Sequence, residues 1–301
     1  MPFVCQAGPR MTARTKGVLC ILVSAFGFAV MGLCVRLADG DGASLPVFQK
    51  SFFRNLVATA VAAAVMARST NRVLWTKGVL PRAAWRPLVG RCVFGTIGIV
   101  GNFYALSHIP LGDASMLNKL SPFAAIFASW VFLGEKLLWR QGVAVVLAFS
   151  GALLVVKPGF AFAGEGGAAM AGLIGGVAAG FAYTCVRQLG LLAVPSALIV
   201  LIFSLFSTVS MIPFLLMKWT PMTGGQLLIL LGAGLSAAVG QFGITAAYRF
   251  ARSRELAAYD YMNVMFSLLL GFVVFGQIPD RFSCLGMILI VLTGLWLARR
   301  R

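Results

Sequence analysis

The chain contains ten apolar runs, each of a length that can cross a lipid bilayer as a helix. The runs fall at about residues 17–37, 44–66, 87–107, 112–133, 141–157, 168–188, 196–217, 225–248, 255–276 and 282–298. A membrane-spanning helix needs about 20 mostly apolar residues. Backbone groups in lipid must find their hydrogen bonds internally, as they do in a helix. The runs therefore predict an all-α integral membrane protein with ten transmembrane helices.

Composition supports this fold class and argues against soluble modules. Only 11% of residues are charged, whereas a soluble domain carries roughly a quarter. The formal net charge of +17 would suggest nucleic-acid binding in a soluble protein. Here the basic residues lie in short connections between apolar runs, where they set the orientation of the helices. We expect the bilayer and a small-molecule solute as partners, and no nucleic acid.

The connections divide into two sets of unequal charge. One set holds Arg10, Arg14, Lys16, Arg68, Arg72, Lys77, Arg82, Arg86, Lys136, Arg140, Arg187, Arg249, Arg252, Arg254, Arg299, Arg300 and Arg301. The other holds only Lys157, Lys218 and Arg281, together with Asp39, Asp41, Asp113, Glu165 and Asp280. Positive residues stay on the cytoplasmic side, so we expect a multi-pass protein of the inner (plasma) membrane with both termini cytoplasmic. The first run is too long for a signal peptide, and Met11 is an alternative start.

An internal repeat relates the two halves of the chain. Residues 113–134 align with residues 255–276, and Gly27-Phe28-Ala29 echoes Gly180-Phe181-Ala182. Five spans per half is an odd number, so the second half enters the membrane from the opposite side and the repeats are inverted. The predicted organisation is an N-terminal segment 1–16, a first repeat 17–158, a second repeat 168–298 and a basic C-terminus 299–301. Inverted repeats place a solute site near the midplane.

Several short motifs in order resemble the drug/metabolite transporter superfamily, closest to its EamA-type ten-helix members. They are Phe53-Arg54, Ala105-Leu106, Asp113-Ala114-Ser115, Leu120-Ser121-Pro122 and Phe132-Leu133-Gly134-Glu135-Lys136. The resemblance covers nearly the whole chain. It implies two five-helix halves around a central solute cavity, and transport of metabolites or drugs in either direction. Gln277 departs from the pattern, because the family often has a glutamate there.

Three cations lie within the predicted outer half of the membrane: Lys50, Arg54 and Lys119. A charged side chain at the centre of a span costs at least ~2.5 kcal/mol unless it is paired or faces water. If these three face one cavity, they favour a solute with a carboxylate or phosphate. Alternatively, Lys50 extends to the membrane surface and Arg54 binds backbone carbonyls of a neighbouring helix.

Arg91 and Asp260 lie at matching depths near the inner end of their spans, which predicts a buried ion pair. In the alternative interpretation Asp260 is a coupling carboxylate that binds a proton or competes with the solute. Asn263 lies one turn from Asp260 on the same helix face.

Uncharged polar residues complete the predicted site. Asn102 and Gln241 occupy similar places in the two halves, and Asn118 and Ser121 flank Lys119. Such amides can also serve only to hydrogen-bond neighbouring helices. The predicted substrate-binding residues are Lys50, Arg54, Asn102, Asn118, Lys119, Ser121, Gln241 and Asn263.

These features favour a secondary transporter that moves a small metabolite by alternating access. The sequence has no ATP-binding motif, so a gradient or solute exchange must drive transport. We expect no enzyme activity, cofactor or metal, because His108 stands alone and the cysteines are scattered. The alternatives are a non-transporting membrane assembly subunit and an exporter of amphipathic drugs or amino acids. The solute, the direction, proton coupling against exchange, and monomer against homodimer stay open.

Overall fold

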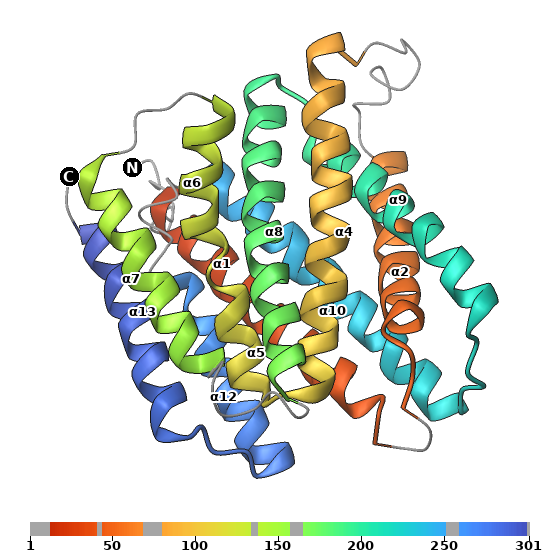
Figure 1. Ribbon diagram of the computed structural model, residues 1–301. Coiled ribbons are helices and arrows are strands. Elements are labelled where there is room, and N and C mark those ends of the chain that lie inside the picture. Colours follow the sequence, from red (N-terminus) through yellow and green to blue (C-terminus); the bar gives the residue numbers. More distant parts are fainter. Residues whose placement is uncertain are drawn as a thin grey trace, which may run out of the picture.

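The computed structural model describes residues 13–40, 44–68, 80–133, 138–156, 165–250 and 259–299. These residues form helices joined by short connections, without strands (Figure 1). The elements are α1 (Ala13–Leu37), α2 (Val47–Arg68), a 3₁₀ turn η1 (Arg82–Ala84), α4 (Trp85–His108), α5 (Leu111–Asn118), α6 (Ser121–Leu133), α7 (Trp139–Val156), α8 (Glu165–Leu191), α9 (Ser196–Met217), α10 (Gly224–Phe250), α12 (Met262–Phe275) and α13 (Arg281–Arg299). Each predicted span contains a helix, which confirms the all-α membrane fold class.

Five of the described helical segments are long and apolar enough to cross a membrane on their own. They are Thr15–Leu37, Arg82–His108, Gly166–Leu191, Ser196–Met217 and Gly224–Ile244. Parts of the sequence prediction lie outside the described residues: most of the N-terminal segment, Met11, the C-terminal Arg300 and Arg301, and the loop residues Asp41, Arg72, Lys77, Lys136, Lys157, Arg252 and Arg254.

The fourth predicted span is two helices and not one. Helix α5 ends at Asn118, Lys119 and Leu120 form a turn, and α6 begins at Ser121. Pro122 lies in the first turn of α6, where its missing N–H removes no intrahelical hydrogen bond. The ninth span is interrupted in the same way, since Tyr259 and Asp260 are helical, Tyr261 forms a turn and α12 begins at Met262.

The helices pack in pairs through small residues. Helix α4 lies against α8 and α1 against α10, while α2 contacts α9 and α7 contacts α13. A Cβ atom added to Gly27 would lie 3.0 Å from the backbone of Gly240, and one added to Gly175 would lie 2.9 Å from the amide nitrogen of Asn102. Small side chains therefore allow these pairs to approach until their backbones touch.

The two ends of the bundle differ in charge. The ends of α2, α6 and α8 and the starts of α4, α7 and α9 lie at one end of the bundle (Figure 1), which we call the basic end. Its described cations include Arg68, Arg82, Arg86, Arg140 and Arg187. The connections α1–α2, α4–α5, α9–α10 and α12–α13 meet at the opposite end.

Candidate functional site

A cavity of about 660 Å³ lies in the centre of the bundle. Both halves of the chain line it, through α1, α2, α4, α5 and α6 on one side and α8, α9, α10, Asp260 and α12 on the other. All the predicted site residues except Lys50 line this cavity: Arg54, Arg91, Asn102, Asn118, Lys119, Ser121, Gln241, Asp260 and Asn263. Their role in binding a solute stays a prediction.

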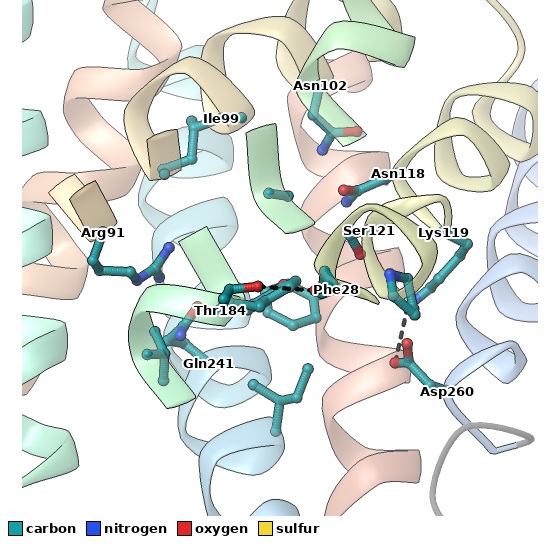
Figure 2. A pocket seen from close by; sticks show the side chains of 18 of the residues that line it. Phe28, Arg91, Ile99, Asn102, Asn118, Lys119, Ser121, Thr184, Gln241 and Asp260 are labelled. Carbon is teal, nitrogen blue, oxygen red and sulfur yellow. Dashed lines mark hydrogen bonds and ion pairs between the residues drawn. The ribbon is translucent and has the colours of Figure 1, made fainter. Parts of the chain in front are cut away.

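The interruptions in the fourth and ninth spans meet across the cavity. Lys119 Nζ lies 2.9 Å from Asp260 Oδ1, and the two side chains are 10% and 14% exposed (Figure 2). The predicted pair of Arg91 with Asp260 is therefore wrong. The prediction estimated depth along straight helices, which placed Lys119 and Asp260 in opposite halves of the membrane. The turn at Lys119 and the turn at Tyr261 bring both side chains to one level.

Arg54 of α2 and Arg91 of α4 are buried cations on another wall of the cavity. Arg54 is 6% exposed and Arg91 5% exposed. In the described part of the chain neither forms an ion pair, and the Nε atom of each has no hydrogen-bond partner. The like charges of the two arginines repel each other, and Tyr183 of α8 also lines the cavity.

Aromatic rings and a glycine hold these two arginines. The Arg91 guanidinium lies 3.8 Å from the centroid of the Phe203 ring, and that of Arg54 lies 5.9 Å from the Phe103 centroid. A Cβ atom on Gly95 would lie 2.7 Å from Arg91 Nη1 and 2.5 Å from Phe203 Cε2. Gly95 therefore leaves the space in which Arg91 stacks on Phe203. Such cation–π contacts stabilise a buried guanidinium but leave its charge in place.

The predicted uncharged residues differ in whether their side chains already form hydrogen bonds within the protein. Asn263 Nδ2 donates to the backbone oxygen of Ala25 at 2.9 Å, so this amide also joins two helices. Asn102 Oδ1 is buried and has no hydrogen-bond partner among the described residues. Sequence reasoning missed Phe203 and Thr184, which also line the cavity. Phe203 stands among other apolar residues in a run without charged side chains, so the sequence gives no signal for it.

Lys50 lies outside the cavity, which contradicts its predicted place beside Arg54. Its side chain is fully buried, with Nζ 2.5 Å from Asp39 Oδ2 and 2.6 Å from Ser107 Oγ. Neither did it extend to the membrane surface, which was the alternative. The buried ammonium group is satisfied because Asp39, at the end of α1, turns back toward α2 and α4.

This Lys50 cluster belongs to a set of polar contacts that closes the end opposite the basic end. Gln49 exchanges two hydrogen bonds with the backbone of Thr220, at 2.9 and 3.2 Å. Gln226 Nε2 donates to the Ala38 oxygen at 3.0 Å, and the amide of Leu111 donates to Gln277 Oε1 at 3.0 Å. These contacts tie α2, α10 and α5 to the segments that follow α9, α1 and α12, respectively.

The cavity extends toward the basic end. Its lining there includes Trp130, Gln141, Arg187, Gly190 and Ser196, which lie at the ends of α6, α7, α8 and α9. No residue of the closed end, from the connections between α1 and α2, α4 and α5, α9 and α10 or α12 and α13, lines it among the described residues. The same part of the chain contains no group of three metal-ligating side chains.

Known proteins resemble this chain in sequence. Residues 15–157 match the EamA-like transporter family. The pseudopaline exporter CntI of Pseudomonas aeruginosa (strain PAO1) is 31% identical over 287 residues, which cover 95% of this chain and 97% of the relative. The chain belongs to the EamA-like transporter family. Membership in this family makes the chain a multi-pass membrane protein of a transporter type and agrees with the resemblance in the sequence motifs.

Other members of the EamA-like family share less of the sequence. The riboflavin transporter of Rhizobium johnstonii (strain 3841) is 27% identical over 215 residues, which cover 71% of this chain and 70% of the relative. One crystal structure of a protein 22% identical in sequence matches with a TM-score of 0.61, over 92% of this chain and 98% of that chain. At this identity the structural likeness shows the fold alone.

Proposed function

We propose that this EamA-like protein is a secondary transporter that exports a small anionic metabolite by alternating access. The observation that carries the proposal is the central cavity of about 660 Å³, which both halves line, which reaches the basic end and which polar contacts close at the other. A carrier needs a site that opens to one side of the membrane at a time. A cavity that reaches one end of the bundle and is closed at the other has the geometry expected for one of the two states of such a site.

The proposed mechanism uses two inverted five-helix repeats, residues 17–158 and 168–298, and the contacts between helices support this organisation. Exchanging the two halves turns the α1–α10 contact into α8–α4, and turns the α1–α12 contact into α8–α6; both members of each pair are present. The interrupted spans also correspond, since the turn at Lys119 and Leu120 and the turn at Tyr261 fall at aligned positions. Interrupted helices at matching places in two repeats point to a transport site.

The charge distribution supports an anionic solute and the direction of export. Arg54, Arg91 and Lys119 line the cavity, and Asp260 is the acidic side chain among the described residues that line it. Positive-inside orientation makes the basic end cytoplasmic. The cavity would then take up its solute from the cytoplasm of a cell that carries the protein in its inner membrane. The P. aeruginosa relative is named as an exporter, which supports the same direction.

Transport by the purified protein tests this function. We expect proteoliposomes with the wild-type protein to release a preloaded labelled anionic metabolite faster than empty liposomes do, with acceleration by unlabelled solute on the other side. Lys119→Ala should slow release about tenfold or more, since it removes a cavity cation and leaves Asp260 buried alone. Arg86→Gln, an exposed cation outside the cavity lining, serves as the matched control. Release by Lys119→Ala at the wild-type rate would refute the assignment.

Amino-acid export is the second candidate, and Asp260 favours it. A zwitterionic solute can place its carboxylate near the cavity arginines and its ammonium group near Asp260, which lines the same cavity. The labelled solutes should therefore include amino acids beside organic acids and phosphate esters. Imposed pH gradients in the same vesicles separate proton coupling from solute exchange.

A further inference from the structure

The charges that line the cavity do not balance. The ionisable side chains of fixed charge in the lining are Arg54, Arg91, Lys119, Arg187 and Asp260. Lys119 and Asp260 neutralise each other in their ion pair. Arg187 is exposed at the basic end, so its charge is not buried in the cavity. Two positive charges remain inside the protein, on Arg54 and Arg91.

Burial makes these two unbalanced charges energetically unfavourable. Both arginines are more than nine-tenths buried, and neither has a carboxylate partner in the described part of the chain. Removing a cation from water without a counter-ion is unfavourable. The Phe103 and Phe203 rings offset part of that cost, but they bring no negative charge. Arg54 Nη1 donates to the neutral Asn55 Oδ1 at 2.8 Å, so a bound anion is what would supply the negative charge that both guanidinium groups lack.

The two arginines are placed to act on one ligand. They stand on α2 and α4, which contact each other, and both line the same cavity as Tyr183 of α8. A guanidinium presents its N–H donors as a planar fork that matches a carboxylate, phosphate or sulfate group. Gly95 keeps the Arg91 fork against Phe203 and at the cavity wall.

We propose that Arg54 and Arg91 form a subsite for a dianion, a solute group that carries two negative charges close together. A monoanion would leave one buried positive charge, whereas a dianion makes the site neutral and leaves the Lys119–Asp260 pair intact. A tetrahedral oxyanion ester and a dicarboxylate share this chemistry. The inference rests on the proposed transport function and names the class of solute that its site takes.

Calorimetric titration of the purified full-length protein at fixed ionic strength tests the subsite. Two pairs of probes differ by one charge within each pair: sulfate against methyl sulfate, and succinate against monomethyl succinate. We expect at least one dianion to bind about tenfold or more tightly than its monoanionic partner, because a second charge-assisted contact forms. The pair that shows the preference distinguishes a tetrahedral oxyanion from a dicarboxylate. Equal affinity within both pairs, or no binding by either dianion, would overturn the proposal.

Variants assign the preference to the two arginines. Arg54→Gln and Arg91→Gln should each remove most of the preference for the dianion, whereas Arg86→Gln should keep it. Gly95→Ala should weaken dianion binding without changing any charge, because its Cβ displaces the Arg91 side chain. If a glutamine variant does not fold, Arg54→Lys and Arg91→Lys keep the charge and lose the fork. A preference unchanged in all the folded variants would refute the subsite.

The same protein distinguishes failure of this inference from failure of the transport function. Dianion binding without transport of any anion in proteoliposomes would refute the carrier and leave the subsite. Transport of monoanions and dianions with equal affinity would refute the dianion subsite and leave the carrier.

Discussion

Replacing Asp39 with Asn should shift this protein toward the state that opens at the end opposite the basic end. Asp39 Oδ2 holds the Lys50 ammonium group at 2.5 Å, and Lys50 is fully buried between α1, α2 and α4. Opening that end would expose both groups to water, so the ion pair stabilises only the state in which the end is closed. The neutral amide leaves Lys50 with the Ser107 hydroxyl as its main partner.

The size of the shift follows from the burial of the pair. Breaking a buried ion pair by removing one partner costs about 3–5 kcal/mol, whereas exposed pairs contribute about 0–1 kcal/mol. The Lys50 side chain is 0% exposed and that of Asp39 is 18% exposed, so water screens the pair in part. We expect about 1.5–3 kcal/mol, and since about 1.4 kcal/mol is a factor of ten, the equilibrium should move about 10- to 100-fold.

Labelling of a cysteine from each side of the membrane measures this equilibrium. Ile99 lines the centre of the cavity (Figure 2), and Ile99→Cys in a background without the native cysteines provides the target. A membrane-impermeant maleimide should react from the basic end in the otherwise wild-type protein. In Asp39→Asn, reaction from the opposite side should rise by the factor given above relative to reaction from the basic end.

Two controls show whether the ion pair is responsible. Asp280→Asn removes a carboxylate at the same end, and an asparagine side chain can still accept the hydrogen bond from the Ser283 amide. This variant should leave the labelling ratio unchanged. Lys50→Met combined with Asp39→Asn removes the buried charge, so the ratio should return toward the wild-type value. A change smaller than about threefold in Asp39→Asn, or the same change in Asp280→Asn, would refute the reasoning.

Two further predictions concern the stability of the core. Lys119→Met and Asp260→Asn should each lower the free energy of unfolding by about 2–3 kcal/mol, and the double variant should recover most of that loss because no unpaired charge remains. Denaturant titration in detergent measures these free energies. A coupling energy between the two residues below about 0.5 kcal/mol would contradict the ion pair. Gly180→Ala places a Cβ 2.5 Å from the Ser121 backbone oxygen, so we expect a loss of about 1–3 kcal/mol from overpacking. Gly190→Ala, where a Cβ meets nothing within 4 Å, is its control, and equal losses in both variants would show that the contact at Gly180 is unimportant.

The helices could be predicted from the sequence because their signals are local. Apolar runs of spanning length are set by the thickness of the bilayer, and every run contains a described helix. Much of the cavity lining was also predictable, since a polar side chain in such a run must face water or a partner. Arg54, Arg91 and Asn102 stood out as polar residues within apolar runs, and all three line the cavity.

Partners of the buried charges were not predictable by the same reasoning. Lys50 was assigned to the cavity because it shares the predicted outer half of the membrane with Arg54 and Lys119. The structure instead pairs it with Asp39, a residue that the sequence places in a loop outside the membrane. Depth along one helix says nothing about which way a side chain points or how a loop folds back, because both depend on packing between helices. Gln277 illustrates the same limit. The sequence showed only that it departs from the family pattern, whereas in the structure its side chain accepts a hydrogen bond from the Leu111 amide in the first turn of α5.

Predicting the Lys119–Asp260 pair from the sequence would have required combining the internal repeat with the positions of the helix interruptions. The alignment of residues 113–134 with residues 255–276 has an offset of 142, which places Lys119 opposite Tyr261 and Asn118 opposite Asp260. If the repeats are inverted around a common axis, two interruptions at aligned positions face each other at one depth, and charges of opposite sign beside them are neighbours. Pro122 marks the interruption in the fourth span, but the ninth span carries no proline between residues 255 and 276, so its turn depends on packing. Depth counted along straight helices therefore selected Arg91 as the partner of Asp260, whereas equivalence between the halves selects Lys119.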